Sequence, residues 1–141
     1  MKKLLSLIAV VLAAAIMAAC SLTVDVSTTA TVKSTDGVVA IKVEEATENA
    51  KLIHAMGKLK AAGELDYTVS GGFVGEINGK AGAADYSSFW ALYTSDAEYS
   101  NAEWGTFDYD GITLASASLG ANDLKVKAGE YYVWVFTEFS Y

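Results

Sequence analysis

His54 and Cys20 are the one histidine and the one cysteine of this 141-residue chain. A hydrolytic triad needs a histidine beside an activated nucleophile, and the sequence has no Gly-x-Ser-x-Gly elbow to supply one. His54 falls two residues after Leu52, off the apolar stripe of the helix expected there, which is typical of a histidine in solvent. One histidine and one cysteine make a zinc or copper site a poor candidate. We therefore expect a protein that is not an enzyme and that uses no metal and no cofactor.

The segment 75–81 comes close to a phosphate-binding loop but lacks two of its features. Three residues, not four, separate its glycines, and Ala81 follows Lys80 where that motif needs Ser or Thr. A simple turn explains the segment.

Asp108-Tyr109-Asp110-Gly111 is similar to part of a calcium loop. When Gly111 takes the sixth position of such a loop, Thr106 is first and Ala117 twelfth, where calcium needs carboxylates. Asp110-Gly111 is instead a signal for a tight hairpin turn. A carboxylate pair for glycoside cleavage stays open as a weaker hypothesis. So does a looser calcium site with the ligands Asp96, Glu98 and Glu103.

Residues 1–19 have the three parts of a secretion signal, namely two lysines, an apolar run and small residues before a cleavage point. As a helix, the apolar run would reach about 24 Å, short of the roughly 30 Å of a membrane core. Met-Ala-Ala-Cys at 17–20 resembles the lipobox of bacterial lipoproteins, with Met17 where Leu is usual. The resemblance implies cleavage before Cys20 and a lipid on its sulfur, which anchors the protein to the extracytoplasmic face of the cell membrane. The alternative is an ordinary signal peptide or an uncleaved anchor, either of which leaves Cys20 as a free thiol.

Cleavage there leaves residues 20–141, which suit a single domain with a short N-terminal tether. Their eight lysines against 17 acidic residues give a formal charge of −9, and the chain has no arginine. Because nucleic-acid binding depends on cationic contacts to phosphate, we expect no nucleic-acid partner. The lack of arginine also disfavours an anionic small ligand, since no bidentate guanidinium contact can form.

One helix is expected in this domain, over residues 47–62. Apolar residues recur there at helical spacing, at Leu52, Ile53, Met56 and Leu59. Thr47 can cap the start of the helix, Glu48 lies in its first turn, and Gly63 can end it.

The rest of the domain has the alternation and the turn signals of β-strands. Residues 21–31 are either a tether or a first strand. Residues 131–139 are apolar on both faces, which indicates a central strand. Residues 96–104 are polar with aromatics, and we expect a loop there. The other expected strands are 38–43, 65–69, 73–77 and 88–94, with a hairpin of 106–109 and 112–115 around Asp110-Gly111.

Four aromatic residues bracket this expected loop and are the candidate ligand-binding residues: Trp90, Tyr93, Tyr99 and Trp104. Exposed aromatic rings there would stack on a sugar or on a flat cofactor. The alternative is that Trp90 and Tyr93 are core residues on opposite faces of one strand, and that Trp104 covers an edge.

Four segments between residues 38 and 136 follow one another in a familiar order. They are the helix residues 50–56, Tyr-Thr-Val-Ser-Gly-Gly-Phe-Val-Gly-Glu-Ile-Asn-Gly at 67–79, Phe-Trp-Ala-Leu-Tyr at 89–93, and 124–136 with its Gly-Glu turn. This order resembles the transcobalamin-like C-terminal domain family. The resemblance implies an α+β fold, a β-grasp-like and mostly antiparallel sheet packed on one helix. In animal cobalamin carriers a related domain covers one face of the corrinoid. The chain departs from the family at 97–121, which looks inserted near the ligand edge and would supply a new site or block the old one.

These observations favour a lipid-anchored, non-enzymatic binding module. Its ligand is a small molecule such as a corrinoid or, as the alternative, a protein or glycan at the cell surface; a carboxylate-based hydrolase is least favoured. Exposed aromatics around a cavity would favour the small molecule, and a flat patch or a bare sheet edge would favour the surface partner. A carboxylate pair with a raised pKa in a cleft would favour the hydrolase.

Overall fold

The structure is a computed structural model that describes residues 26–139. The predicted signal peptide and Cys20 lie outside the described residues. Between residues 26 and 139, no helix is both long and apolar enough to cross a membrane.

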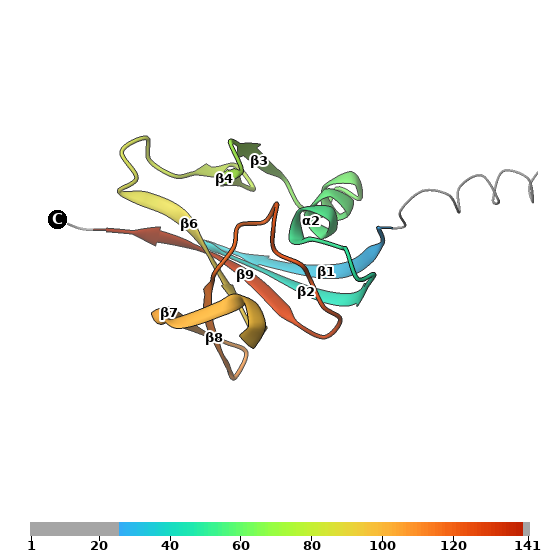
Figure 1. Ribbon diagram of the computed structural model, residues 1–141. Coiled ribbons are helices and arrows are strands. Elements are labelled where there is room, and N and C mark those ends of the chain that lie inside the picture. The colour runs from blue at the N-terminus through green and yellow to red at the C-terminus, as the bar shows by residue number, and fades with distance from the viewer. Residues whose placement is uncertain (1–25, 140–141) are drawn as a thin grey trace, which may run out of the picture.

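Six strands form one antiparallel sheet in the order β1-β2-β9-β6-β8-β7 (Figure 1). Their bounds are β1 Thr28–Thr35, β2 Val38–Ala46, β6 Ser88–Thr94, β7 Ser100–Tyr109, β8 Ile112–Ala117 and β9 Tyr131–Glu138. One helix, α2 (Leu52–Ala61), packs on this sheet in the described part of the chain. The predicted α+β class with a mostly antiparallel sheet is confirmed.

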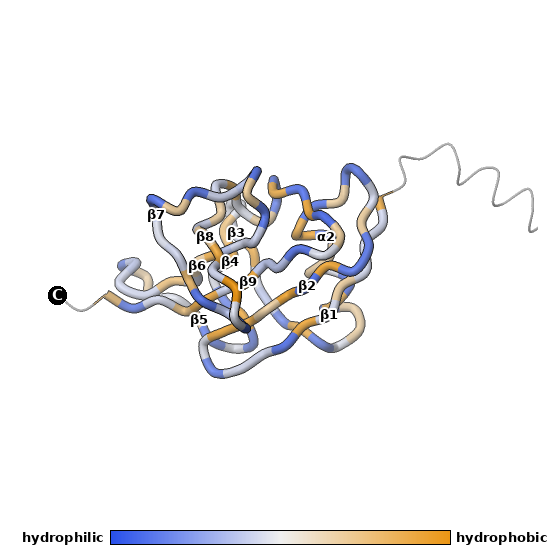
Figure 2. The backbone as a smooth tube through the Cα atoms, turned by 90° about the horizontal axis from the view of Figure 1, so that it is seen from below, coloured by the Kyte–Doolittle hydropathy of each residue, from blue (hydrophilic) through white to orange (hydrophobic). Residues whose placement is uncertain are grey.

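The strand β9 lies in the middle of the sheet, between β2 and β6. Its even-numbered residues from Tyr132 to Phe136 belong to the larger core on one face of the sheet. Its odd-numbered residues from Tyr131 to Val135 belong to a smaller core on the other face. A strand covered on both faces needs apolar side chains on both, so the prediction of a central strand is confirmed. Figure 2 shows this hydrophobic stretch and that of β2 in the middle of the molecule.

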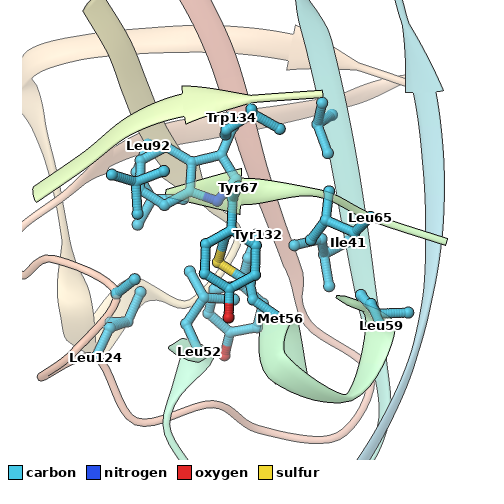
Figure 3. Close-up of a cluster of buried hydrophobic side chains, with 14 of the residues drawn as sticks. Ile41, Leu52, Met56, Leu59, Leu65, Tyr67, Leu92, Leu124, Tyr132 and Trp134 are labelled. Atoms are coloured by element: carbon cyan, nitrogen blue, oxygen red, sulfur yellow. The ribbon is translucent and has the colours of Figure 1, made fainter. Parts of the chain in front are cut away.

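The helix α2 and a small three-stranded sheet cover the first face of the large sheet (Figure 1). The small sheet has the order β3-β4-β5, with bounds Tyr67–Ser70, Phe73–Ile77 and Lys80–Ala81. In the close-up, Leu52 and Met56 of α2 meet Tyr132 of the central strand (Figure 3). Each fully buried aliphatic side chain of this core stabilises the fold by roughly 1.5–3 kcal/mol.

Beyond the short stretch where β8 pairs with β6, the β7–β8 hairpin folds over the second face of the sheet (Figure 1). β8 pairs with β6 at Tyr93 and Thr94 only, and Leu114 then packs without exposed surface against Val133. The expected loop at 96–104 is therefore wrong in its second half. A short 3-10 helix, η1 (Ala97–Tyr99), is followed directly by β7. Because β7 is an exposed edge strand, its polar residues resemble those of a loop.

The helix starts later than predicted, at Leu52 and not at residue 47. The hydroxyl of Thr47 donates to the C=O of Ser27 and accepts from its N–H, so it caps no helix. Lys51 forms an isolated bridge with Lys125 instead of a helical turn. Pairing with distant residues has thus replaced the first turn of the expected helix, and Glu48 lies outside it. Gly63 ends the helix as expected, with φ of +75°.

The two-residue turns that the sequence predicted are present. Asp110 and Gly111 both have positive φ, +49° and +77°, and join Tyr109 to its paired residue Ile112. Positive φ at both central residues is the requirement of the hairpin turn that follows the twist of the strands. Asn78-Gly79 forms the same kind of turn between β4 and β5.

Candidate functional site

The clearest hollow on the described surface lies between β4 and β6, and we call it the aromatic groove. It has a volume of about 480 Å³. Its large apolar side chains are Phe73, Val74, Tyr86, Phe89 and Trp90. Phe73 exposes 76% of its surface and Tyr86 74%. These are the largest exposures of any large apolar or aromatic residue between residues 26 and 139. Exposed aromatic rings around a hollow are the usual features of a binding site.

Tight backbone turns hold the two exposed rings in place. Phe73 begins β4 directly after Gly71 and Gly72, whose φ values of +58° and +84° turn the chain back on β3. Tyr86 itself has φ of +62°, in the left-handed region that costs a non-glycine residue roughly 1 kcal/mol. The carboxylate of Asp85 fixes this loop by accepting hydrogen bonds from the N–H and the hydroxyl of Ser87. Backbone strain held by its surroundings is often a mark of function.

The indole of Trp90 forms the floor of the groove. Its side chain is 7% exposed, and its Nε1–H donates to the C=O of Lys80 at 2.7 Å. Its ring meets that of Phe136 edge to face, with the centroids 5.3 Å apart. Beside it, the rings of Phe89 and Phe139 lie 5.5 Å apart. The floor is therefore rigid, while the rim of the groove is open to solvent.

A second hollow of about 480 Å³ adjoins the groove and shares four of its residues. Its other walls include Leu92 of β6, Trp134 of β9, and Ser118 and Asp123 of the segment after β8. No lysine lines either hollow in the described chain. The indole N–H of Trp134 is buried without a hydrogen-bond partner among the described residues. Because no lysine lines it, the site is suited to an apolar, neutral or cationic ligand.

The structure does not bring the four predicted ligand residues together. Trp90 lines the aromatic groove, whereas Tyr93 faces the other side of the sheet and lies 5.7 Å from the ring of Phe107. Tyr99 packs against the edge of the larger core, with Nζ of Lys127 5.4 Å from its ring. Trp104 is 65% exposed in the irregular part of β7. Sequence reasoning missed Phe73 and Tyr86. Phe73 follows a glycine pair and Tyr86 lies between Asp85 and Ser87, so each is a large aromatic residue beside a turn signal that could have been used.

Asp96 and Glu98, proposed above as calcium ligands, both pair with the ammonium group of Lys127. Nζ of Lys127 lies 3.2 Å from Oδ2 of Asp96, which is 4% exposed. The hydrogen bond and the charge of Lys127 lower the pKa of Glu98, and the hydrogen bond to Glu98 raises the pKa of Lys127. Glu103 lies apart on β7, where its N–H is bonded to Asn101. No group of three or more potential metal ligands occurs between residues 26 and 139.

His54 lies in the first turn of α2 and is exposed, as predicted. Its Nδ1 accepts a hydrogen bond from the N–H of Lys51 at 2.9 Å. This bond satisfies one of the free backbone donors at the start of the helix, which is a structural role.

A smaller groove of about 310 Å³ lies on the second face of the sheet. Lys33 and Lys42 line it together with Tyr109, Asp110 and Tyr131. Nζ of Lys42 lies 5.6 Å from the ring centre of Tyr131, so this lysine already has an aromatic partner. Asp110 also offsets part of the positive charge, and the aromatic groove remains the better site.

No family model, no curated protein and no solved structure matches this chain.

Proposed function

We propose that residues 20–141 form a non-enzymatic binding module that a lipid on Cys20 holds at the extracytoplasmic face of a cell membrane. Its ligand occupies the aromatic groove. The observation that carries this proposal is the pair of exposed rings, Phe73 and Tyr86, fixed by tight turns above the buried floor of Trp90. Large aromatic side chains lose hydrophobic stabilisation when they are left in water, so a ligand that covers them gains it.

A small apolar or flat molecule such as a corrinoid is the first candidate ligand. A corrin ring presents a broad apolar face to the exposed rings, and its amide side chains present acceptors. This proposal includes two expectations from the sequence. They are the resemblance to the transcobalamin-like C-terminal domain family and a β-grasp-like arrangement of the sheet. The absence of lysine from the lining supports a ligand that is not anionic.

A carboxylate-based hydrolase is disfavoured. Such an enzyme needs a carboxyl group that stays protonated near neutral pH, whereas Asp85 and Glu98, the two described carboxyl groups with a clear pKa shift, both have a lowered pKa. In addition, the exposed His54 already accepts a hydrogen bond at the start of α2.

Equilibrium dialysis tests the proposal on the full lipid-anchored chain in phospholipid nanodiscs, with empty nanodiscs as the background. The probe is a corrinoid, followed by uncharged aromatic compounds. Phe73→Ala and Tyr86→Ala should each weaken binding roughly threefold to tenfold, the loss of one aromatic contact. Trp104→Ala removes another largely exposed ring, which does not line the groove, and should change nothing.

Equal retention of every compound by wild type and by the two groove variants would remove the groove as the ligand site. Retention of aromatic compounds but not of the corrinoid, with the same dependence on Phe73, would keep the groove and exclude the corrinoid.

A further inference from the structure

The segment 88–92 of β6 has a paired strand on one side only. β9 pairs with β6 along its whole length, whereas β8 pairs with it at Tyr93 and Thr94 alone. Just before β6, the N–H of Phe139 donates to the C=O of Ser87. Along an antiparallel strand, successive residues direct their N–H and C=O groups to opposite sides. The odd-numbered residues of β6 therefore direct these groups at β9. The even-numbered residues point theirs at the opposite edge.

Trp90 is the centre of this open edge. At one end, the C=O of Ser88 accepts from the N–H of Ala83 at 3.0 Å, and at the other end Thr94 pairs with Ala115. Between them, no strand of the described chain pairs with the outward N–H and C=O of Trp90 or with the N–H of Leu92. Natural sheets usually protect such an edge with charge, proline or a bulge, and residues 88–92 contain no charge and no proline.

The open edge runs between the two hollows. Phe89 and Trp90 line both of them, and Leu92 lines the second. In a strand laid along this edge, every second side chain would point to the face that carries the hollows.

The one charged residue that lines the two hollows in the described chain is acidic. Asp123 lines the second hollow, and no lysine lines either one in the described chain. Asp85 lies next to Tyr86 at the other end of the site, and its hydrogen bonds with Ser87 lower its pKa, so it is ionised at neutral pH. The whole chain has a formal charge of −7. The complementary partner is therefore basic.

We propose that the partner at this site is an extended segment of another protein that adds to the 88–92 edge as a further strand. Its alternate side chains are apolar and enter the hollows, and basic residues flank them. Backbone hydrogen bonds supply affinity in this mode of recognition, and the pockets for alternate side chains supply specificity. The inference rests on the proposed function, because the same groove holds the ligand. It replaces the small molecule by a peptide and favours the surface-partner alternative.

A labelled, capped peptide of about six residues, with phenylalanine at alternate positions and lysine at both ends, tests this inference by fluorescence anisotropy. The receptor is the full lipid-anchored chain in nanodiscs of neutral phospholipid. The matched control peptide carries N-methyl groups on the residues that face β6, which removes its donors and keeps its side chains. We expect the control to bind at least roughly tenfold more weakly. Hydrogen exchange should slow in residues 88–92 when the unmodified peptide binds.

Two carboxylate variants test the charge. Asp123→Asn should weaken binding of the peptide roughly twofold to fivefold at low salt, and this effect should become smaller as salt is added. Asp110→Asn makes the same charge change on the hairpin turn at the second face of the sheet and should leave binding unchanged.

Three outcomes would overturn the inference. They are equal binding of both peptides, protection outside residues 88–92, and no peptide binding at all. If the aromatic compounds still bind through Phe73 in any of these cases, the proposed function stands and only the peptide is excluded. If neither peptide nor aromatic compound depends on Phe73, both proposals fail.

Discussion

Leu124 and Leu119 are two leucines of one connecting segment with opposite surroundings. Leu124 has no exposed surface and packs in the larger core, and its C=O accepts from the N–H of Leu52 at the start of α2. Leu119 is 40% exposed, after the end of β8. The same residue type thus contributes very differently to stability at these two positions.

Leu124→Ala should lower the free energy of unfolding by roughly 2–5 kcal/mol, because it removes buried methyl groups and leaves a cavity. Leu119→Ala is the matched control and should cost less than roughly 1 kcal/mol. Urea denaturation followed by tryptophan fluorescence measures both. Similar losses in the two variants would contradict the packing described for the segment after β8.

The hydroxyl of Tyr132 gives the fold a dependence on alkaline pH. It accepts a hydrogen bond from the N–H of Lys127 at 2.9 Å, and burial raises the pKa of Tyr132 to about 12. Its pKa in the unfolded chain is about 10. Because the folded state holds the proton more tightly, this stabilisation is complete below pH of about 10 and is lost as pH rises to about 12.

Tyr132→Phe should lower the free energy of unfolding by roughly 1 kcal/mol near pH 8, since the N–H of Lys127 loses its acceptor. The difference from wild type should shrink between pH 10 and 12, where only wild type has this tyrosine to ionise. Urea denaturation at several pH values measures that difference, and Tyr86→Phe controls for the loss of an exposed hydroxyl. A difference that stays constant up to pH 12 would contradict the burial of the Tyr132 hydroxyl.

Hairpin turns are the elements that depend most directly on single residues. Gly111 has φ of +77°, and an added Cβ would meet no atom within 4 Å, so its requirement is conformational and not steric. Gly75 also has free space around its Cα, but its φ is not positive. A comparison of alanine substitutions at these two glycines therefore separates the effect of backbone strain from that of steric crowding.

Gly111→Ala should destabilise the protein by roughly 1 kcal/mol or more, because alanine is strained at positive φ. Gly75→Ala should be neutral or slightly stabilising, since alanine restricts the unfolded chain. Thermal unfolding of both variants tests this pair of expectations. A Gly111→Ala variant as stable as wild type would mean that the β7–β8 turn has a different conformation.

Local signals predicted some elements well and could not predict others. The turn at Asp110-Gly111 depends on its own two residues, and the central position of β9 follows from its two apolar faces, so both were readable. The start of α2 could not be predicted in this way, because Thr47 forms hydrogen bonds with Ser27, 20 residues away. The groove was not readable either. Phe73 begins β4 and Tyr86 lies in the loop before β6, and only the packing of β4 across β6 makes them neighbours.

The large sheet has two distinct ends, and the candidate site lies at only one of them. β1 begins at Thr28, opposite Ala46, at the end of the sheet where β9 starts. The groove lies at the other end, because Ser88, which lines it, pairs there with Glu138. The seven residue-to-residue steps from Cys20 to Ser27 reach at most about 25 Å when extended. A lipid on Cys20 would therefore hold the first end near the membrane and leave the groove facing outward.

Cys20→Ser tests the anchor on which this orientation depends. Two acyl chains are enough for stable membrane anchoring, so the wild-type chain should be recovered with membranes and should incorporate an alkyne-labelled fatty acid. The variant should incorporate none, should leave the membrane fraction and should migrate differently on a gel. Thr23→Ser, a conservative change three residues away, should behave as wild type. A Cys20→Ser chain that stays bound and migrates unchanged would contradict the lipid anchor, and the outward orientation of the groove would lose its basis.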